Sequence, residues 1–123
     1  MRSRYAAFAI GDAEYLWSTL HADHDDRAAP RETFLRALRA ARGRAYPSLA
    51  ILDARRRGRV AEVLFFAGLT VRGRDASFVE LSDFEHDGTG WRYRSGILVA
   101  RADLGRDPAG LGIDDFLAIA AAR

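Results

Sequence analysis

The hydrophobic periodicity of this chain changes once, near Ser48, and that change limits the folds the chain can adopt. Before this point, apolar residues recur every three to four positions, the spacing of a helix that buries one face. After it, the pattern alternates and glycine-containing turns separate the runs, as in antiparallel strands. Helices followed by a meander of strands predict an α+β domain, with the helices packed in a strongly curved antiparallel sheet.

Three helices are predicted before the change. The first ends at Gly11, and Asp12 can cap the second, which runs to about His21. A third extends from Pro30 to Gly43, because proline suits the first turn of a helix and glycine its end.

Four strands are predicted after the change. Apolar residues on both faces of the second strand place it at the centre of the sheet or in an interface. Gly96 is interpreted as a bulge in the fourth strand, and residues 114–122 predict a short C-terminal helix. The turns between the strands are predicted at 55–58, 72–75 and 86–90.

Composition narrows the class of protein. The 123 residues contain no linker or repeat, so we expect a single domain, 1–123. The absence of cysteine excludes disulfides, thiol catalysis and cysteine-ligated zinc. No apolar run reaches the ~18 residues of a membrane helix, so we expect no membrane partner and a cytoplasmic protein.

The basic residues are all arginine, 19 in number, but the net charge is only +2. Arginine binds phosphate well, which would suit nucleic acid. However, arginine without lysine, together with abundant alanine, is typical of a bacterial protein from a GC-rich genome. The clusters at 55–59 and 72–74 also lie in successive turns, at opposite ends of a meander. We therefore do not expect a nucleic-acid partner.

Three motifs occur in one order across residues 1–96. They are residues 1–5 with Gly11-Asp12, then Glu80-x-Ser82-x-Phe84, then Gly90-Trp91-x-Tyr93-x-x-Gly96. Together they resemble the YchJ-like, SEC-C-associated family. This resemblance implies the cone-shaped nuclear-transport-factor-2-like (NTF2-like, or cystatin-like) fold and a family with no settled activity. The chain lacks the cysteine-rich, zinc-binding SEC-C motif, and residues 97–123 do not map onto the family.

Glu80 is the ionisable residue of greatest interest, because it shares a strand face with Phe78 and Phe84 that is expected to line the cone. The resemblance implies one catalytic use for it: steroid isomerases and polyketide cyclases of the wider fold use a cavity carboxylate as general base. Glu80 would then be the base, with its pKa raised by burial, and Tyr93 would donate a hydrogen bond to an oxyanion.

The alternative for Glu80 is a structural ion pair with Arg2 or Arg4, since a buried carboxylate needs such a partner. We favour this pair, in which Ser82 satisfies a neighbouring polar group. Candidates for lining a cavity or binding a small apolar ligand in the cone are Tyr15, Trp17, Ser82 and Trp91.

Two histidine-containing patterns resemble metal sites. His21-x-Asp23 with His86 has the form of an iron-binding triad, and His21-x-x-His24 that of a helical pair. Because these residues fall at a helix end and in a turn, we predict no metal, and no cofactor.

The sequence thus predicts a non-catalytic cytoplasmic binding or interaction module. The alternatives are a small-molecule isomerase, cyclase or dehydratase that uses Glu80, and an RNA- or ribosome-associated accessory protein. We also expect a homodimer through the open face of the sheet, because the second strand is apolar on both faces.

Overall fold

The computed structural model describes residue 4 and residues 13–22, 24–28, 30–39 and 44–123. Within these residues the helices come first and the strands follow, as the periodicity predicts. The elements are α2 (Ala13–Ser18), the 3-10 helix η1 (Asp25–Ala28), α3 (Arg31–Arg39), β1 (Arg44–Arg57), β2 (Val60–Val71), β3 (Arg74–Asp75), β4 (Phe78–His86), β5 (Trp91–Ala100), the 3-10 helix η2 (Arg101–Asp103) and α4 (Ile113–Ala121).

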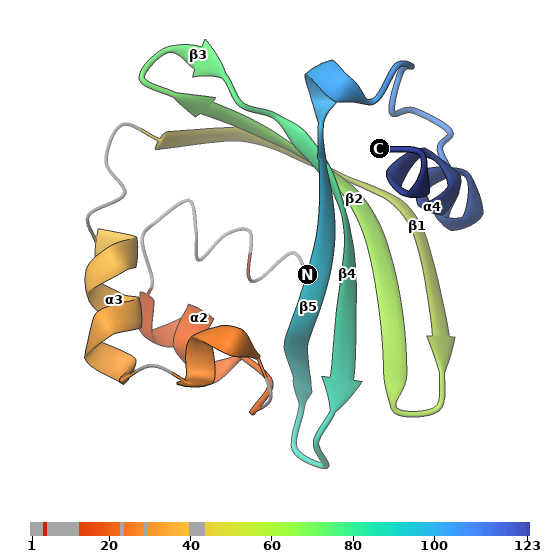
Figure 1. The fold of residues 1–123 in the computed structure, drawn as a ribbon. Coiled ribbons are helices and arrows are strands. Elements are labelled where there is room, and N and C mark those ends of the chain that lie inside the picture. Colours follow the sequence, from red (N-terminus) through yellow and green to blue (C-terminus); the bar gives the residue numbers. More distant parts are fainter. Residues whose placement is uncertain (1–3, 5–12, 23, 29, 40–43) are drawn as a thin grey trace.

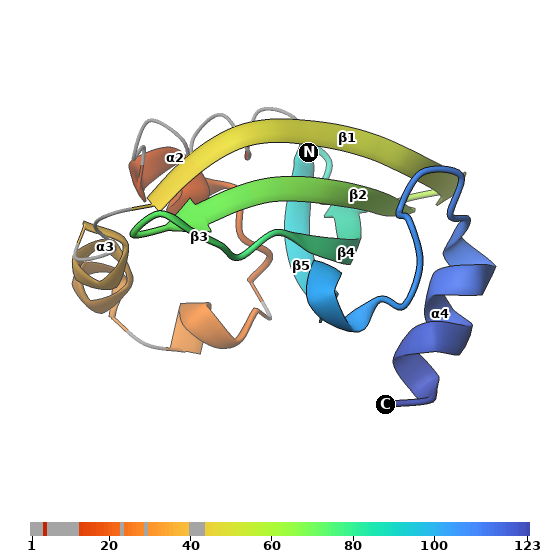
Figure 2. The same cartoon turned by 90° about the horizontal axis from the view of Figure 1, so that it is seen from above.

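The strands form one antiparallel sheet in the order β1-β2-β4-β5, with the short β3 paired to the end of β2. β2 is therefore an inner strand, which is one of the two positions that its two apolar faces predict. The long strands β1 and β2 bend strongly along their length (Figures 1 and 2). In both views α2 and α3 lie on one side of β4 and β5, and α4 lies on the other. The predicted α+β fold, with a curved sheet and a short C-terminal helix, is confirmed.

The side of the sheet that faces α4 holds the larger buried cluster. Val79 and Leu81 of β4 pack there with Phe116 of α4, whose side chain is fully enclosed. The other buried members are Leu64, Val99, Leu104, Leu111 and Ile113. The C-terminal segment therefore covers part of the face on which we expected two copies to pair. Pairing of two copies stays a prediction.

The opposite side of the sheet faces the N-terminal helices. Because strand side chains alternate, Glu80, Ser82 and Phe84 of β4 point to this side, together with Phe65 of β2. All four are buried, and Leu16 and Leu20 at α2 are buried as well. This is the side of the sheet that we expected to line the cone.

Two details differ from the prediction. The turn predicted at 55–58 is shorter, because β1 continues through Arg57 and only Gly58 and Arg59 turn the chain. Gly58 has a φ of 63°, which glycine adopts without strain. The irregularity in β5 does not lie at Gly96 either: the register shifts between the pairs Asp83–Ser95 and Phe84–Tyr93.

Among the described residues, no helix combines the length and apolar character needed to cross a membrane.

Candidate functional site

A buried polar cluster surrounds Glu80 on the side of the sheet that faces α2. Its members are Arg4, Thr19, Glu80, Ser82 and Tyr93, and we refer to them as the Glu80 cluster. The Glu80 side chain is only 8% exposed. Its Oε2 atom accepts hydrogen bonds from the Ser82 hydroxyl and, at 3.0 Å, from the Tyr93 hydroxyl. Both donors belong to the family-like motifs described above, Ser82 to the second motif and Tyr93 to the third.

Arg4 supplies the positive charge of the cluster and is itself 5% exposed. Its Nη1 atom donates to the Leu16 carbonyl at 3.2 Å and to the Thr19 hydroxyl. Its guanidinium lies 4.6 Å from the centre of the Tyr93 ring, in cation–π geometry. The charge of Arg4 also acts on Glu80 and stabilises the carboxylate. Arg4 therefore contacts both α2 and the sheet.

Backbone hydrogen bonds fix Tyr93 against the residues that follow α2. The Tyr93 N–H donates to the Thr19 carbonyl, and the His21 N–H donates to the Tyr93 carbonyl, both at 2.6 Å. These bonds hold the phenol in place beside Glu80. Nothing in the periodicity of the sequence indicates this pairing.

Gly96 of β5 lies directly over the carboxylate. A methyl group at this position would lie 2.5 Å from the Tyr93 hydroxyl and 2.8 Å from Glu80 Cδ, closer than real Cβ atoms approach other groups. The role of Gly96 is therefore close approach to the Glu80 cluster, and the bulge assigned to it from the sequence was wrong. A glycine in a strand interior can signal either.

Burial dominates the electrostatics of the cluster. It raises the pKa of the Glu80 carboxyl above its ordinary value, although Ser82, Tyr93 and Arg4 all oppose the rise. Burial and the nearby Glu80 also raise the pKa of the Tyr93 phenol. Burial lowers the pKa of Arg4, against the attraction of Tyr93 and Glu80.

The aromatic candidates have different neighbours. The Trp17 ring packs under Arg27, with 4.5 Å between guanidinium and ring centre, and Arg27 also donates to the Trp17 carbonyl. The Trp91 ring packs under Arg56 at 5.0 Å. Tyr15 is half-buried, and its carbonyl accepts a hydrogen bond from the Thr19 hydroxyl. Arg2 lies outside the described residues, so its expected pairing with Glu80 is not addressed.

The three histidines of the metal-site patterns contact other side chains. His21 Nε2 lies 3.1 Å from Glu85 Oε1. The His24 ring lies 5.5 Å from the Tyr93 ring, and the His86 ring 5.2 Å from the Trp91 ring. Within the described part of the chain, no group of three or more His, Asp or Glu residues could hold a metal ion. Asp23 lies outside that part.

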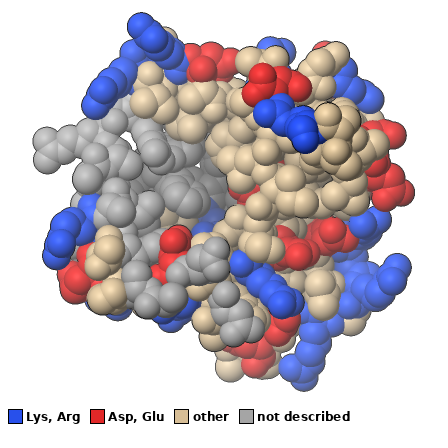
Figure 3. All heavy atoms as spheres, in the orientation of Figure 1, with Lys and Arg blue, Asp and Glu red and all other residues tan. Residues whose placement is uncertain are grey.

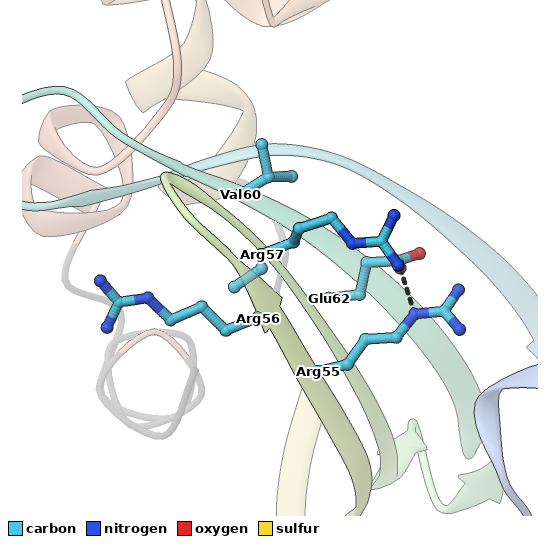
Figure 4. A pocket seen from close by; sticks show the side chains of 6 residues that line it. Arg55, Arg56, Arg57, Val60 and Glu62 are labelled. Atoms are coloured by element: carbon cyan, nitrogen blue, oxygen red, sulfur yellow. Dashed lines mark hydrogen bonds and ion pairs between the residues drawn. The ribbon is translucent and has the colours of Figure 1, made fainter.

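The arginines near the β1–β2 turn line a surface groove of about 410 Å³ (Figure 4). Arg55 binds Glu62 at 2.6 Å and Asp114 at 3.3 Å. Arg56 points to the other side of the hairpin, towards Trp91 (Figure 4). The turn at 72–73 lies at the opposite end of β2 (Figure 1), as the meander predicts. Basic and acidic side chains are interspersed around the face drawn in Figure 3.

A curved antiparallel sheet with helices packed on one side is the architecture of an NTF2-like domain. The family described as "YchJ, middle NTF2-like domain" matches residues 1–96, and the chain belongs to that family. The predicted family and fold are thereby confirmed.

The structure is also similar to that of a SEC-C motif containing protein from Rhodopseudomonas palustris, determined in solution. The TM-score is 0.66 at 25% sequence identity, and the match covers 80% of this chain and 75% of that one. No curated protein matches the chain. The matches thus identify an NTF2-like domain of a SEC-C-associated family and establish no catalytic or binding activity.

Proposed function

We propose that this domain is a non-catalytic binding or interaction module, in which the Glu80 cluster has a structural role. The observation that carries the proposal is the enclosure of the carboxylate. Its Oε2 atom already accepts hydrogen bonds from Ser82 and Tyr93, and Gly96 leaves no room for another atom on that side. A general base must instead have an oxygen within reach of the proton it removes.

The structural role is to join Arg4, α2 and the sheet. Arg4 donates to α2 and packs on Tyr93, while its charge offsets the negative charge of Glu80. Tyr93 joins the two charges, because its ring packs on the Arg4 guanidinium and its hydroxyl donates to Glu80. Removing either buried charge leaves the other less compensated, which is costly. The cluster therefore couples the packing of two parts of the fold that are distant in sequence.

A double-mutant cycle tests this role. We expect Arg4→Met and Glu80→Gln to show a coupling free energy of about 0.5–3 kcal/mol in urea unfolding, the range found for residues in one network of contacts. The matched control is Arg94→Met with Glu85→Gln, because those side chains are 3.4 Å apart but partly exposed. Exposed pairs of this kind contribute about 0–1 kcal/mol. Equal coupling in the two cycles would contradict the structural role.

The second candidate is an isomerase, cyclase or dehydratase with Glu80 as base. The observation in its favour is the raised pKa of Glu80 beside the Tyr93 hydroxyl. A panel of small carbonyl compounds, followed by NMR at Tyr93 and Ser82, distinguishes the two functions. A compound that binds saturably at these residues, and whose turnover Glu80→Gln abolishes, would establish the enzyme and overturn the module.

A further inference from the structure

β5 forms one edge of the sheet, and among the described residues only its beginning has a backbone partner on the outer side. Thr19 and His21 pair with the outer side of Tyr93. Beyond that point, no backbone hydrogen bond from the described residues reaches the outer side of the strand. The Arg101 N–H donates inward to the Ser77 carbonyl. Alternation along an antiparallel strand then directs the N–H and C=O groups of Gly96, Leu98 and Ala100 outward.

The side chains along this uncovered edge are apolar and exposed. Ile97 is 45% exposed and Leu98 is 55% exposed. The two point to opposite faces of the sheet, because Ile97 pairs with Leu81 and Leu98 with Glu80. Residues 95–100 carry no charge. A strand placed against this edge would therefore cover apolar surface on both faces.

The other edge of the same sheet is different. β1 carries three consecutive exposed arginines, Arg55, Arg56 and Arg57, and its register shifts twice against β2. Charges and bulges are devices by which edge strands avoid pairing with other chains. β1 has both devices, and the segment 95–100 of β5 has neither.

We propose that this edge binds a second copy of the chain, with the two β5 strands antiparallel about a two-fold axis. Alignment of residues 96–100 with themselves places Leu98 opposite Leu98 and Gly96 opposite Ala100 of the second copy. Every outward N–H then faces an outward C=O. The sheet continues from one copy into the other, as in recognition by strand addition.

Charge makes a second copy the fitting occupant. The paired segment 96–100 is uncharged in both copies, and residues 101–103 leave the strand as η2. No like charges oppose each other within the paired segment, so the edge is compatible with itself, as a two-fold interface requires. The interface is formed by the strand edge, with Ile97 on the side that faces α4 and Leu98 on the side of Glu80. Its use does not depend on the role of Glu80.

Sedimentation velocity over a dilution series tests the proposal. We expect the native chain to form dimers that dissociate on dilution, and Leu98→Lys to weaken the dimer at least ten-fold, because two lysines would then face each other. The control is Val60→Lys, since Val60 is 44% exposed and belongs to β2, away from the edge. This variant should dimerise like the native chain. Circular dichroism checks that each variant is folded.

Amide hydrogen exchange locates the interface independently of any variant. The amides of Gly96, Leu98 and Ala100 should exchange more slowly in concentrated than in dilute samples. A native chain that remains monomeric at concentrations used for NMR would overturn the proposal. So would a dimer that Leu98→Lys leaves intact, or one that protects the β1 edge instead.

Discussion

Replacement of Gly96 by alanine tests whether the Glu80 cluster is as closely packed as its geometry indicates. The φ angle of Gly96 lies outside the left-handed region, so alanine is compatible with its backbone. The new methyl group would meet Glu80 and the Tyr93 hydroxyl, at 2.5 Å from the latter. The substitution therefore perturbs the cluster without introducing backbone strain.

Two costs add to the expected effect. Overpacking a closed interior costs about 1–3 kcal/mol. Displacement of the Tyr93 hydroxyl also breaks its 3.0 Å hydrogen bond to the carboxylate. A hydrogen bond to a charged group contributes about 1.5–3 kcal/mol. We expect Gly96→Ala to lower the free energy of unfolding by about 2.5–6 kcal/mol, a large part of the ~5–15 kcal/mol typical of a domain.

Equilibrium unfolding in urea measures the loss of stability. An unchanged m-value, the slope of the unfolding free energy against urea concentration, shows that the compactness of the two states is preserved. Gly90→Ala is the matched control, because a methyl group there would lie 3.7 Å from the nearest Arg92 atom, an ordinary contact. In the Gly96→Ala background, Tyr93→Phe should restore part of the stability, since it removes the nearest hydroxyl. If Gly96→Ala and Gly90→Ala lost equally little, the reasoning from close approach would be refuted.

Two further predictions concern the attachment of α4 and the ionisation of Glu80. The Asp53 Oδ2 atom accepts a hydrogen bond from the Ile113 N–H at 2.9 Å, at the start of α4. Asp53→Ala should lower the free energy of unfolding by about 0.5–2 kcal/mol and speed hydrogen exchange of the Ile113 amide. Asp53→Asn should retain most of the stability, because its side-chain oxygen can still accept the bond. Equal losses in the two variants would contradict this role of the hydrogen bond. Because burial raises the pKa of Glu80, its ionisation opposes folding. The free energy of unfolding of the native chain, relative to that of Glu80→Gln, should be greatest below the pKa of Glu80 in the unfolded state. It should fall as the pH rises through the pKa of Glu80 in the folded state. A relative stability that increases with pH would contradict the raised pKa.

The candidate site was only partly predictable. Glu80, Ser82 and Tyr93 stand in motifs that the sequence singles out, and period-two alternation correctly places Glu80 on the buried face. Thr19 could not be recognised, because its role depends on α2 ending next to β5. Gly96 carried a signal, but a strand glycine indicates a bulge as readily as close approach. Only the position of the Glu80 carboxylate beneath it distinguishes the two.

The order of helices and strands, and the centrality of β2, follow from the sequence by itself, because periodicity and turn residues act over a few neighbouring positions. The path of the C-terminal segment does not. Residues 101–121 cross to the far side of the sheet, where Phe116 is buried against β4 and Asp53 of β1 binds the first turn of α4. Which strand edge lacks a backbone partner among the described residues was likewise decided by tertiary structure. Such contacts join residues up to 60 positions apart, and the chain must fold before they exist.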